Sequence, residues 1–269
     1  MNINEGEEPV VNLNRKEEFI STGIETLDKL LEGGIPKGYT VLILGVPGSG
    51  VEILAKQLAA TGKTLYFSTD ETRDRVLDTM QKFGWSIENI NIVDIASLFS
   101  ESILKSQEER IEAYKKRSKI DLKELISESS YGMPSIKKSE TDFLALLLTK
   151  TVEKLSPPEK TIINSLDFFL EHYPEEDVFK VIHALKIRNM NAKTALFLIM
   201  TKGIHSQPFE RKMETLGDCI IELEVVKRGS SFDRYISIKK MRNYARKIGI
   251  ASYTIENKGF VLDTIERIM

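Results

Sequence analysis

The residues best suited to chemistry form a glycine-rich turn, Gly45-Val-Pro-Gly-Ser-Gly50, between an apolar run and a helical pattern. In such a turn, glycines let successive backbone N–H groups wrap a phosphate group at the N-terminus of the following helix. The sequence therefore predicts a phosphate-binding loop, and a plain tight turn without a ligand is the alternative. The residues expected to line the loop are Gly45, Pro47, Gly48, Ser49, Gly50, Val51 and Glu52.

The two residues after the loop lack the groups that normally hold a triphosphate. A working loop continues with Lys, which neutralises the β- and γ-phosphates, and with Ser or Thr, which ligates Mg²⁺. Val51 and Glu52 stand there instead, so the site shifts by two charge units toward repelling a triphosphate. One unit pair about 5 Å apart interacts by roughly 3 kcal/mol at an effective dielectric constant near 20. Neither Lys37, before the strand, nor Lys56, about 140° round the helix from Val51, is positioned to replace the lysine.

The loop is carried by strands that alternate with helices. Nearly unbroken apolar strands in such an alternation are typical of a parallel sheet covered by helices on both faces. After about residue 217 the pattern changes to strands joined by short polar turns, which predicts a C-terminal antiparallel extension of an α/β fold. The expected strands are 39–44, 64–68, 91–95, 161–166, 194–200, 220–226, 234–240 and 251–256.

A polar arm precedes one domain. Residues 1–18 show no clear hydrophobic period and are expected to form a flexible or loosely docked arm before a single domain at 19–269. Residues 96–160 interrupt the alternation with a charged segment, a Ser/Gly/Pro loop and an apolar helix. This stretch is either an extended crossover with a solvated face or an inserted element that binds a partner protein.

Composition excludes several classes of protein. The chain has 269 residues, is 29% charged and carries a formal net charge of −2, which argues against a histone-like nucleic-acid binder. One cysteine excludes an internal disulfide, and three histidines without paired spacing argue against zinc or another dedicated metal site. No apolar run approaches the roughly 18 residues of a membrane span. We expect a cytoplasmic protein without membrane partners.

Three segments resemble the KaiC/RadA-like branch of the RecA superfamily of ring-forming ATPases. STGIETLDKLLEGGIPKGYTVLILGVPGSG, residues 21–50, resembles the first helix, glycine pair, first strand and phosphate loop of that family. TLYFSTDETRDRVLDTMQKFGW, residues 64–85, resembles its second strand, acidic pair and following helix. GDCIIELEVV and ISIKKMRN resemble its late strands. The resemblance covers about 20–95 and 160–262 and implies a RecA-like sheet that binds ATP or ADP with Mg²⁺.

The resemblance implies roles for two acidic residues and reveals one substitution. Asp70 and Glu71 occupy the positions that activate and orient water at the γ-phosphate, or they merely form the acidic first turn of a helix. Asn164 stands where the family's second metal-binding motif has Asp, so it brings no charge to a cation. Asp167, three residues on, would approach a metal only after rearrangement. Glu52 and Asn164 are thus the weak candidates for a Mg²⁺ site.

The resemblance also implies a contact between chains. Lys240 and Arg242 match the family's pair that reaches the γ-phosphate of a neighbouring subunit, and strand alternation places both on one face. Ordinary surface charge on an edge strand is the alternative. Because no internal repeat is visible, a ring would consist of separate chains, and we expect a homo-oligomer.

These observations predict a pseudo-ATPase, that is, a KaiC-like protein that has a regulatory or assembly role and hydrolyses ATP weakly or not at all. One alternative is an active ATPase in which Glu52 ligates Mg²⁺ and a neighbour's Lys240 or Arg242 replaces the missing lysine. The other is a DNA-binding recombinase paralogue. Its basic clusters, which include Lys137-Lys138, are short and mixed with acidic residues, so nucleic-acid binding is not expected.

Overall fold

The protein is described by a computed structural model that covers residues 18–117, 141–153, 157–244 and 249–263. Residues 1–17 of the expected arm and the Ser/Gly/Pro loop at 127–134 lie outside the described residues, as does the basic pair Lys137-Lys138.

A nine-stranded sheet organises the molecule, in the order β11-β10-β9-β8-β3-β7-β6-β4-β5. The six strands from β8 to β5 pair in parallel, and β9, β10 and β11 continue the sheet in antiparallel fashion. The strands are β3 (Thr40–Gly45), β4 (Thr64–Ser68), β5 (Ile90–Asp94), β6 (Lys160–Asn164), β7 (Ala195–Thr201), β8 (Cys219–Arg228), β9 (Ser231–Met241), β10 (Gly249–Glu256) and β11 (Gly259–Leu262). The predicted mostly parallel α/β sheet with an antiparallel extension is confirmed.

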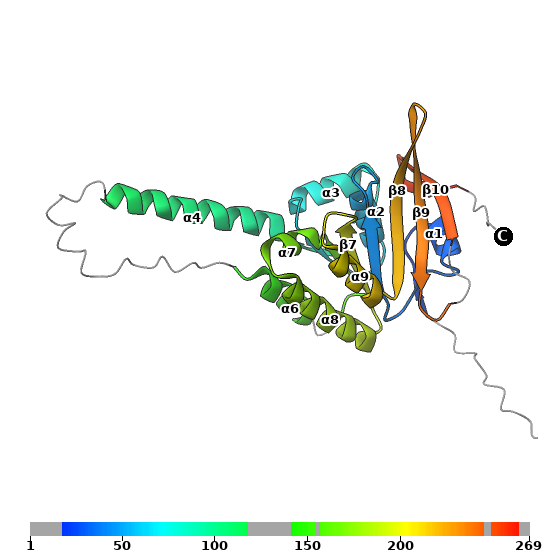
Figure 1. The fold of residues 1–269 in the computed structure, drawn as a ribbon, viewed down its shortest axis with the longest axis horizontal. Coiled ribbons are helices and arrows are strands. Elements are labelled where there is room, and N and C mark those ends of the chain that lie inside the picture. The colour runs from blue at the N-terminus through cyan, green and yellow to red at the C-terminus, as the bar shows by residue number, and fades with distance from the viewer. Residues whose placement is uncertain (1–17, 118–140, 154–156, 245–248, 264–269) are drawn as a thin grey trace, which may run out of the picture.

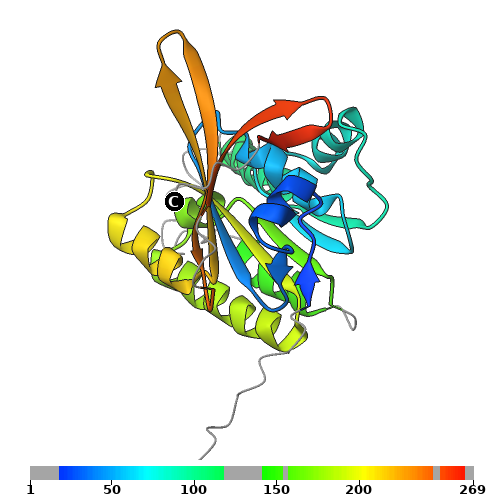
Figure 2. The same ribbon diagram turned by 90° about the vertical axis from the view of Figure 1, so that its right-hand side faces the viewer.

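Alternation along the buried strands fills two cores, one on each face of the sheet. In β3, Val41 and Ile43 point into one core, whereas Leu42 and Leu44 point into the other. Both faces are therefore covered (Figures 1 and 2). The first core packs against α1 (Glu25–Leu30), α2 (Val51–Ala59) and α3 (Arg73–Lys82), and the second against α6 (Phe143–Val152), α7 (Asp167–His172), α8 (Glu175–Ala192) and α9 (Gln207–Leu216).

Two elements extend beyond this body. The hairpin of β8 and β9 rises past the other strands, and the long helix α4 (Ile95–Arg117) projects away from the sheet (Figures 1 and 2). Leu104 and Ile111 on α4 are 60% and 52% exposed. Whether 96–160 is a crossover or a partner-binding element stays a prediction, since 118–140 lie outside the described residues.

The short strands β1 (Phe19–Ile20) and β2 (Ile35–Pro36), which precede and follow α1 in the chain, pair in a separate two-stranded sheet. None of the helices in the described part of the chain is long and apolar enough to cross a membrane.

Candidate functional site

The glycine-rich turn lies at the carboxyl edge of the parallel strands, between β3 and α2. Gly48 and Gly50 adopt φ angles of 82° and 76°, which side chains rarely tolerate, and Gly50 is the N-cap of α2. The backbone N–H of Ser49 donates to the carbonyl of Val46 at 3.0 Å and tightens the turn. Backbone N–H groups at the start of a nine-residue helix favour an anion, so the predicted loop has the geometry to cradle a phosphate.

The two left-handed glycines differ in what surrounds them, which gives a paired prediction. A Cβ at Gly50 would lie 2.3 Å from Cδ1 of Ile255, whereas a Cβ at Gly48 would have no atom within 4 Å. Gly48→Ala should cost only backbone strain, about 1 kcal/mol of unfolding free energy. Gly50→Ala must also displace the end of the Ile255 side chain and should cost about 2 kcal/mol in total. Urea unfolding of both variants measures the difference, and equal costs would contradict the packing of β10 on the loop.

The antiparallel extension covers this loop. The Tyr253 hydroxyl on β10 donates to the Ser49 carbonyl at 2.7 Å, and Nε of Arg234 on β9 donates to the Gly48 carbonyl at 3.2 Å. Sequence reasoning missed both residues. They lie about 180 to 200 positions after the loop, and no spacing signal links them to it. The contact with Arg234 places a guanidinium group beside a loop that lacks its lysine.

Val51 and Glu52 take different directions at the start of α2. A Cβ at Gly45 would lie 2.7 Å from Cβ of Val51, and Val51 packs against the first core. The side chain at the lysine position thus folds back onto the start of the loop. Glu52 is exposed and makes no hydrogen bond or ion pair with another described residue.

Lys56 lies inside the protein and binds one of the two predicted catalytic carboxylates. Its Nζ is 2.5 Å from Oε2 of Glu71, and its side chain is 1% exposed, against 23% for Glu71. Lys56 is therefore engaged by Glu71, and that it does not replace the missing loop lysine stays a prediction. Nε of Arg75 lies 3.6 Å from the other Glu71 oxygen, so two cations face this carboxylate.

Asp70 and Glu71 both precede α3, whose N-cap is Thr72. They are therefore not in the first turn of the helix, which was the alternative interpretation. Asp70 lies toward β6, where the Ser165 hydroxyl is 3.4 Å from Oδ2 of Asp70. Burial raises the pKa of Asp70, and the nearby Asp167 carboxylate raises it further. The two acidic neighbours thus differ: Glu71 is held by cations, and Asp70 faces another carboxylate.

Asn164 and Asp167 are both engaged by protein groups. The Asn164 amide donates to the Tyr66 hydroxyl at 2.9 Å. Asp167 accepts hydrogen bonds from the backbone and hydroxyl of Thr201, and Nε2 of His205 lies 2.7 Å from its Oδ1. Sequence reasoning did not connect Asp167 with Thr201 and His205, because their proximity depends on the pairing of β6 with β7.

A second lysine stands close to the loop but is occupied. The backbone N–H of Lys202 donates to the Gly45 carbonyl at 3.0 Å. Its ammonium group binds the buried Glu222 and lies 3.3 Å from Glu224. Lys239 binds the same Glu222 carboxylate at 2.7 Å. The ammonium of Lys202 is therefore committed to these carboxylates.

Lys240 and Arg242 lie at the opposite edge of the sheet from the loop. β9 runs antiparallel to β8, so its end at Met241 is beside Cys219, where β8 begins. Nζ of Lys240 donates to the carbonyls of Glu214 and Thr215 at the end of α9, and Nε of Arg242 lies 3.0 Å from Oδ1 of Asp218. β9 is flanked by β8 and β10, so it is not an edge strand. No contact joins this pair to the loop of its own chain.

The backbone of the site fits a phosphate better than its side chains fit a metal. The loop offers N–H groups at a helix N-terminus, and Arg234 supplies a positive charge beside it. Two positions that normally bind the metal are changed. Glu52 stands where a Ser or Thr hydroxyl would ligate Mg²⁺, and Asn164, whose amide donates to Tyr66, stands where an Asp is expected. Among the described residues, no three His, Cys, Asp or Glu side chains are grouped so as to hold a metal ion. The residues present thus fit a nucleotide phosphate and do not fit a standard Mg²⁺ shell.

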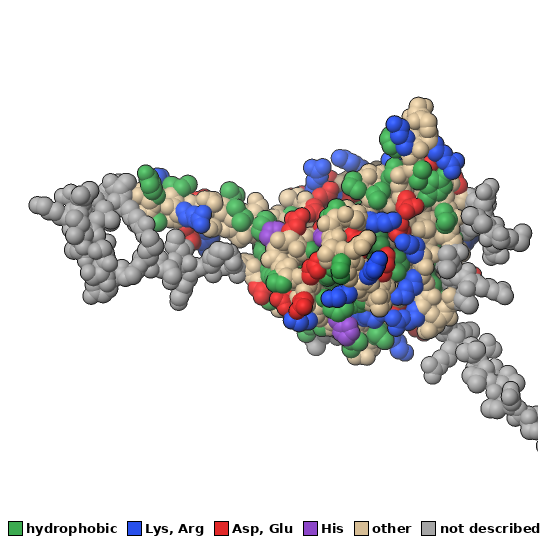
Figure 3. All heavy atoms as spheres, viewed as in Figure 1, with side chains coloured by type: hydrophobic (Ala, Val, Ile, Leu, Met, Phe, Trp, Pro, Cys, Tyr) green, Lys and Arg blue, Asp and Glu red, His purple; other side chains and the backbone are tan. Residues whose placement is uncertain are grey.

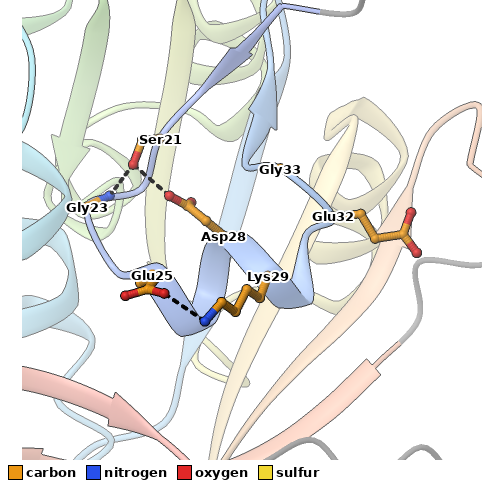
Figure 4. A pocket seen from close by; sticks show the side chains of 7 residues that line it. All are labelled: Ser21, Gly23, Glu25, Asp28, Lys29, Glu32 and Gly33. Carbon is orange, nitrogen blue, oxygen red and sulfur yellow. Dashed lines mark hydrogen bonds and ion pairs between the residues drawn. The ribbon is translucent and has the colours of Figure 1, made fainter.

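A separate cavity of about 620 Å³ lies beside α1 (Figure 4). Its acidic side chains Asp28 and Glu25 are bound by neighbouring protein groups. Oδ2 of Asp28 accepts a hydrogen bond from the Ser21 hydroxyl at 2.6 Å, and Oδ1 accepts two from Thr22. Glu25 pairs with Lys29 at 2.7 Å. Asp28 therefore holds the turn that precedes α1.

A family model and one curated relative match this chain along most of its length, and a second relative matches part of it. A family model described as "ATPase: KaiC" matches residues 20–266. The circadian clock oscillator protein KaiC of Parathermosynechococcus lividus is 25% identical over 246 residues, which cover 88% of this chain and 41% of that protein. The DNA repair protein RadA of Aquifex aeolicus is 35% identical over 105 residues, which cover 37% of this chain and 23% of that protein. The chain thus spans less than half the length of these relatives.

The fold is shared with a solved structure. A KaiC-like protein from Pyrococcus horikoshii superposes with a TM-score of 0.64 at 18% identity, covering 92% of this chain and 100% of that one. This likeness confirms the predicted RecA-like arrangement of the sheet and its helices.

Proposed function

Because this chain belongs to the KaiC ATPase family, we propose that it is a pseudo-ATPase, which binds nucleotide weakly and has a regulatory or assembly role without appreciable hydrolysis. The glycine-rich turn holds the phosphates through its backbone. The lysine and aspartate positions that would support hydrolysis carry Val51 and Asn164, and the Glu71 carboxylate is paired with Lys56.

The ion pair between Lys56 and Glu71 is the observation that carries this proposal. A carboxylate that orients attacking water must accept a hydrogen bond from it. Glu71 instead has Oε2 2.5 Å from a buried ammonium, so this oxygen is engaged in an ion pair. With Val51 packed on Gly45 and Asn164 bound to Tyr66, the metal and the γ-phosphate also lose their usual partners.

Arg234 is the residue that we expect to sustain nucleotide binding. Its guanidinium group is beside the Gly48 carbonyl, so it adds one positive charge to a loop that otherwise carries Glu52. Arg234→Gln should weaken ADP and ATP binding about tenfold, equivalent to about 1.4 kcal/mol. Calorimetric titration measures the change. Arg228→Gln, on the same hairpin and paired with Asp233, is the matched control and should leave the affinity unchanged.

The assembly role rests on Lys240 and Arg242. These cations face away from the loop of their own chain, at the opposite edge of the sheet. In a homo-oligomeric ring this edge would meet the loop of a neighbour, so bound nucleotide would lie between chains and strengthen their contact.

Phosphate release tests the absence of hydrolysis. Full-length protein with ATP and Mg²⁺ should release no phosphate above buffer at any protein concentration. Sustained release that is lost in Asp70→Asn or Glu71→Gln would overturn the proposal.

Glu52, which is exposed and pairs with no other residue in the described part of the chain, favours one second candidate, an ATPase completed by a neighbouring chain. A carboxylate at the start of α2 is a possible Mg²⁺ ligand. In that case release would rise steeply with protein concentration and would be lost in Arg242→Ala, which removes the neighbour's cation.

A further inference from the structure

A basic groove runs between α8 and α9, on the opposite face of the sheet from α2. Its volume is about 680 Å³, and its lining combines the apolar side chains of Phe179 and Pro208 with four cations: Lys186, Arg211, Lys212 and Arg242. Lys and Arg side chains gather over α9 and the adjoining strands, whereas acidic side chains gather toward α7 (Figure 3). The groove therefore suits an occupant that is both acidic and apolar.

Two of the lining cations, Lys186 and Arg242, share one buried acidic partner, Asp218. Asp218 is buried, and its Oδ1 lies 2.7 Å from Nζ of Lys186 and 3.0 Å from Nε of Arg242. Arg211 and Lys212 are exposed, and their side chains pair with no acidic group in the described ranges. The groove consequently keeps an excess of positive charge.

The N-terminal arm enters the fold beside one end of this groove. The Glu18 carbonyl accepts a hydrogen bond from the Lys37 N–H at 3.0 Å, and the Glu18 carboxylate lies 2.6 Å from Nζ of Lys37. Two residues later, the Tyr39 hydroxyl donates to the carbonyl of Arg242 at 2.7 Å. Glu18, the first described residue, is thus linked to the groove residue Arg242 through Lys37 and Tyr39.

The length and composition of the preceding segment match the groove. Seventeen residues precede Glu18 and reach at most roughly 56 Å when extended, whereas the groove spans about 10 Å along α8 from Lys186 to Phe179. The segment carries three acidic residues at 5–8 (EGEE), directly followed by the apolar run Pro9-Val10-Val11 and by Leu13.

We propose that residues 5–13 dock in this groove of their own chain. The acidic residues at 5–8 pair with Arg211 and Lys212, and the apolar residues that follow cover Phe179 and Pro208. Arg242 is part of the groove, so a docked arm and a neighbouring chain would compete for this edge. That consequence rests on the proposed function, whereas the docking itself does not.

Zero-length carbodiimide cross-linking of the full-length chain tests the docking, because it joins a carboxylate to an amine only when they are in contact. Tryptic peptides are then identified by mass spectrometry. We expect the peptide Met1–Arg15 to be linked to Lys212 within one chain, and the yield to fall at about 1 M salt, where the screening length is about 3 Å. Arg211→Glu keeps the Lys212 amine and reverses the neighbouring charge, so the yield should fall about tenfold.

Arg228→Glu, on the β8–β9 hairpin away from the groove, is the matched control and should leave the cross-link unchanged. A mixture of isotope-labelled and unlabelled chains distinguishes links within a chain from links between chains. Links between chains, an arm linked equally to lysines elsewhere, or no link at Lys212 would each overturn the proposal. Phosphate release is not part of this readout, so its outcome does not depend on whether the site hydrolyses ATP.

Discussion

Restoring the two residues after the loop, Val51→Lys with Glu52→Thr, should raise the affinity for ATP at least about a hundredfold. The double change adds one positive charge and removes one negative charge beside the phosphates. Each unit is worth up to roughly 3 kcal/mol at 5 Å and an effective dielectric constant near 20, and about 2.7 kcal/mol already gives a hundredfold. Calorimetric titration with ATP and Mg²⁺ measures the gain.

The control for this gain is Val51→Met with Glu52→Thr, which lengthens the side chain without adding the positive charge. Because Val51 packs on Gly45 and the first core, thermal unfolding of both variants shows whether the loop survives the change. We expect the Met variant to gain less than the Lys variant. Equal gains would mean that removal of Glu52 alone, and not the lysine charge, limits binding.

The second large effect is a loss of stability in Glu71→Gln. Removing the carboxylate charge leaves the ammonium of Lys56 buried without its counterion, since the Lys56 side chain is 1% exposed. Breaking one partner of a buried ion pair typically costs 3–5 kcal/mol, and we expect about 3 kcal/mol because Glu71 itself is partly solvated. Urea unfolding at neutral pH measures it.

Asp70→Asn is the matched control and should have the opposite sign. Burial and the Asp167 carboxylate raise the pKa of Asp70 in the folded protein above its ordinary 3.8. The folded state then binds the proton more tightly than the unfolded state, so Asp70 lowers stability as pH rises through and above 3.8. Replacing it with Asn removes that loss. A Glu71→Gln variant as stable as Asp70→Asn would contradict the structural role of the Lys56–Glu71 pair.

Local sequence patterns were sufficient for the sheet and the loop. Strand 64–68 was predicted with its observed bounds, and the glycines at 48 and 50 have the positive φ angles that their position requires. These features depend on neighbours in the chain. The single strand that the patterns missed in the main sheet, β11, is only four residues long.

The partners of the site could not be predicted in the same way. Arg234 and Tyr253 reach the loop only through the register of β9 and β10, which the sequence does not specify at this distance. Lys56 was expected to point away from the loop, but its pairing with Glu71 could not be predicted, because it depends on how α2 packs beside β4. The roles of Asp70, Glu71, Lys240 and Arg242 stay predictions.

The central claim is that this site binds nucleotide without hydrolysing it. The most direct measurement is a calorimetric titration of the full-length protein with ATP and ADP, with and without Mg²⁺, with phosphate release and the mass by light scattering measured on the same samples. The account predicts weak binding that depends little on Mg²⁺, a change in mass and no phosphate release. Tight, Mg²⁺-dependent binding accompanied by sustained phosphate release would contradict it.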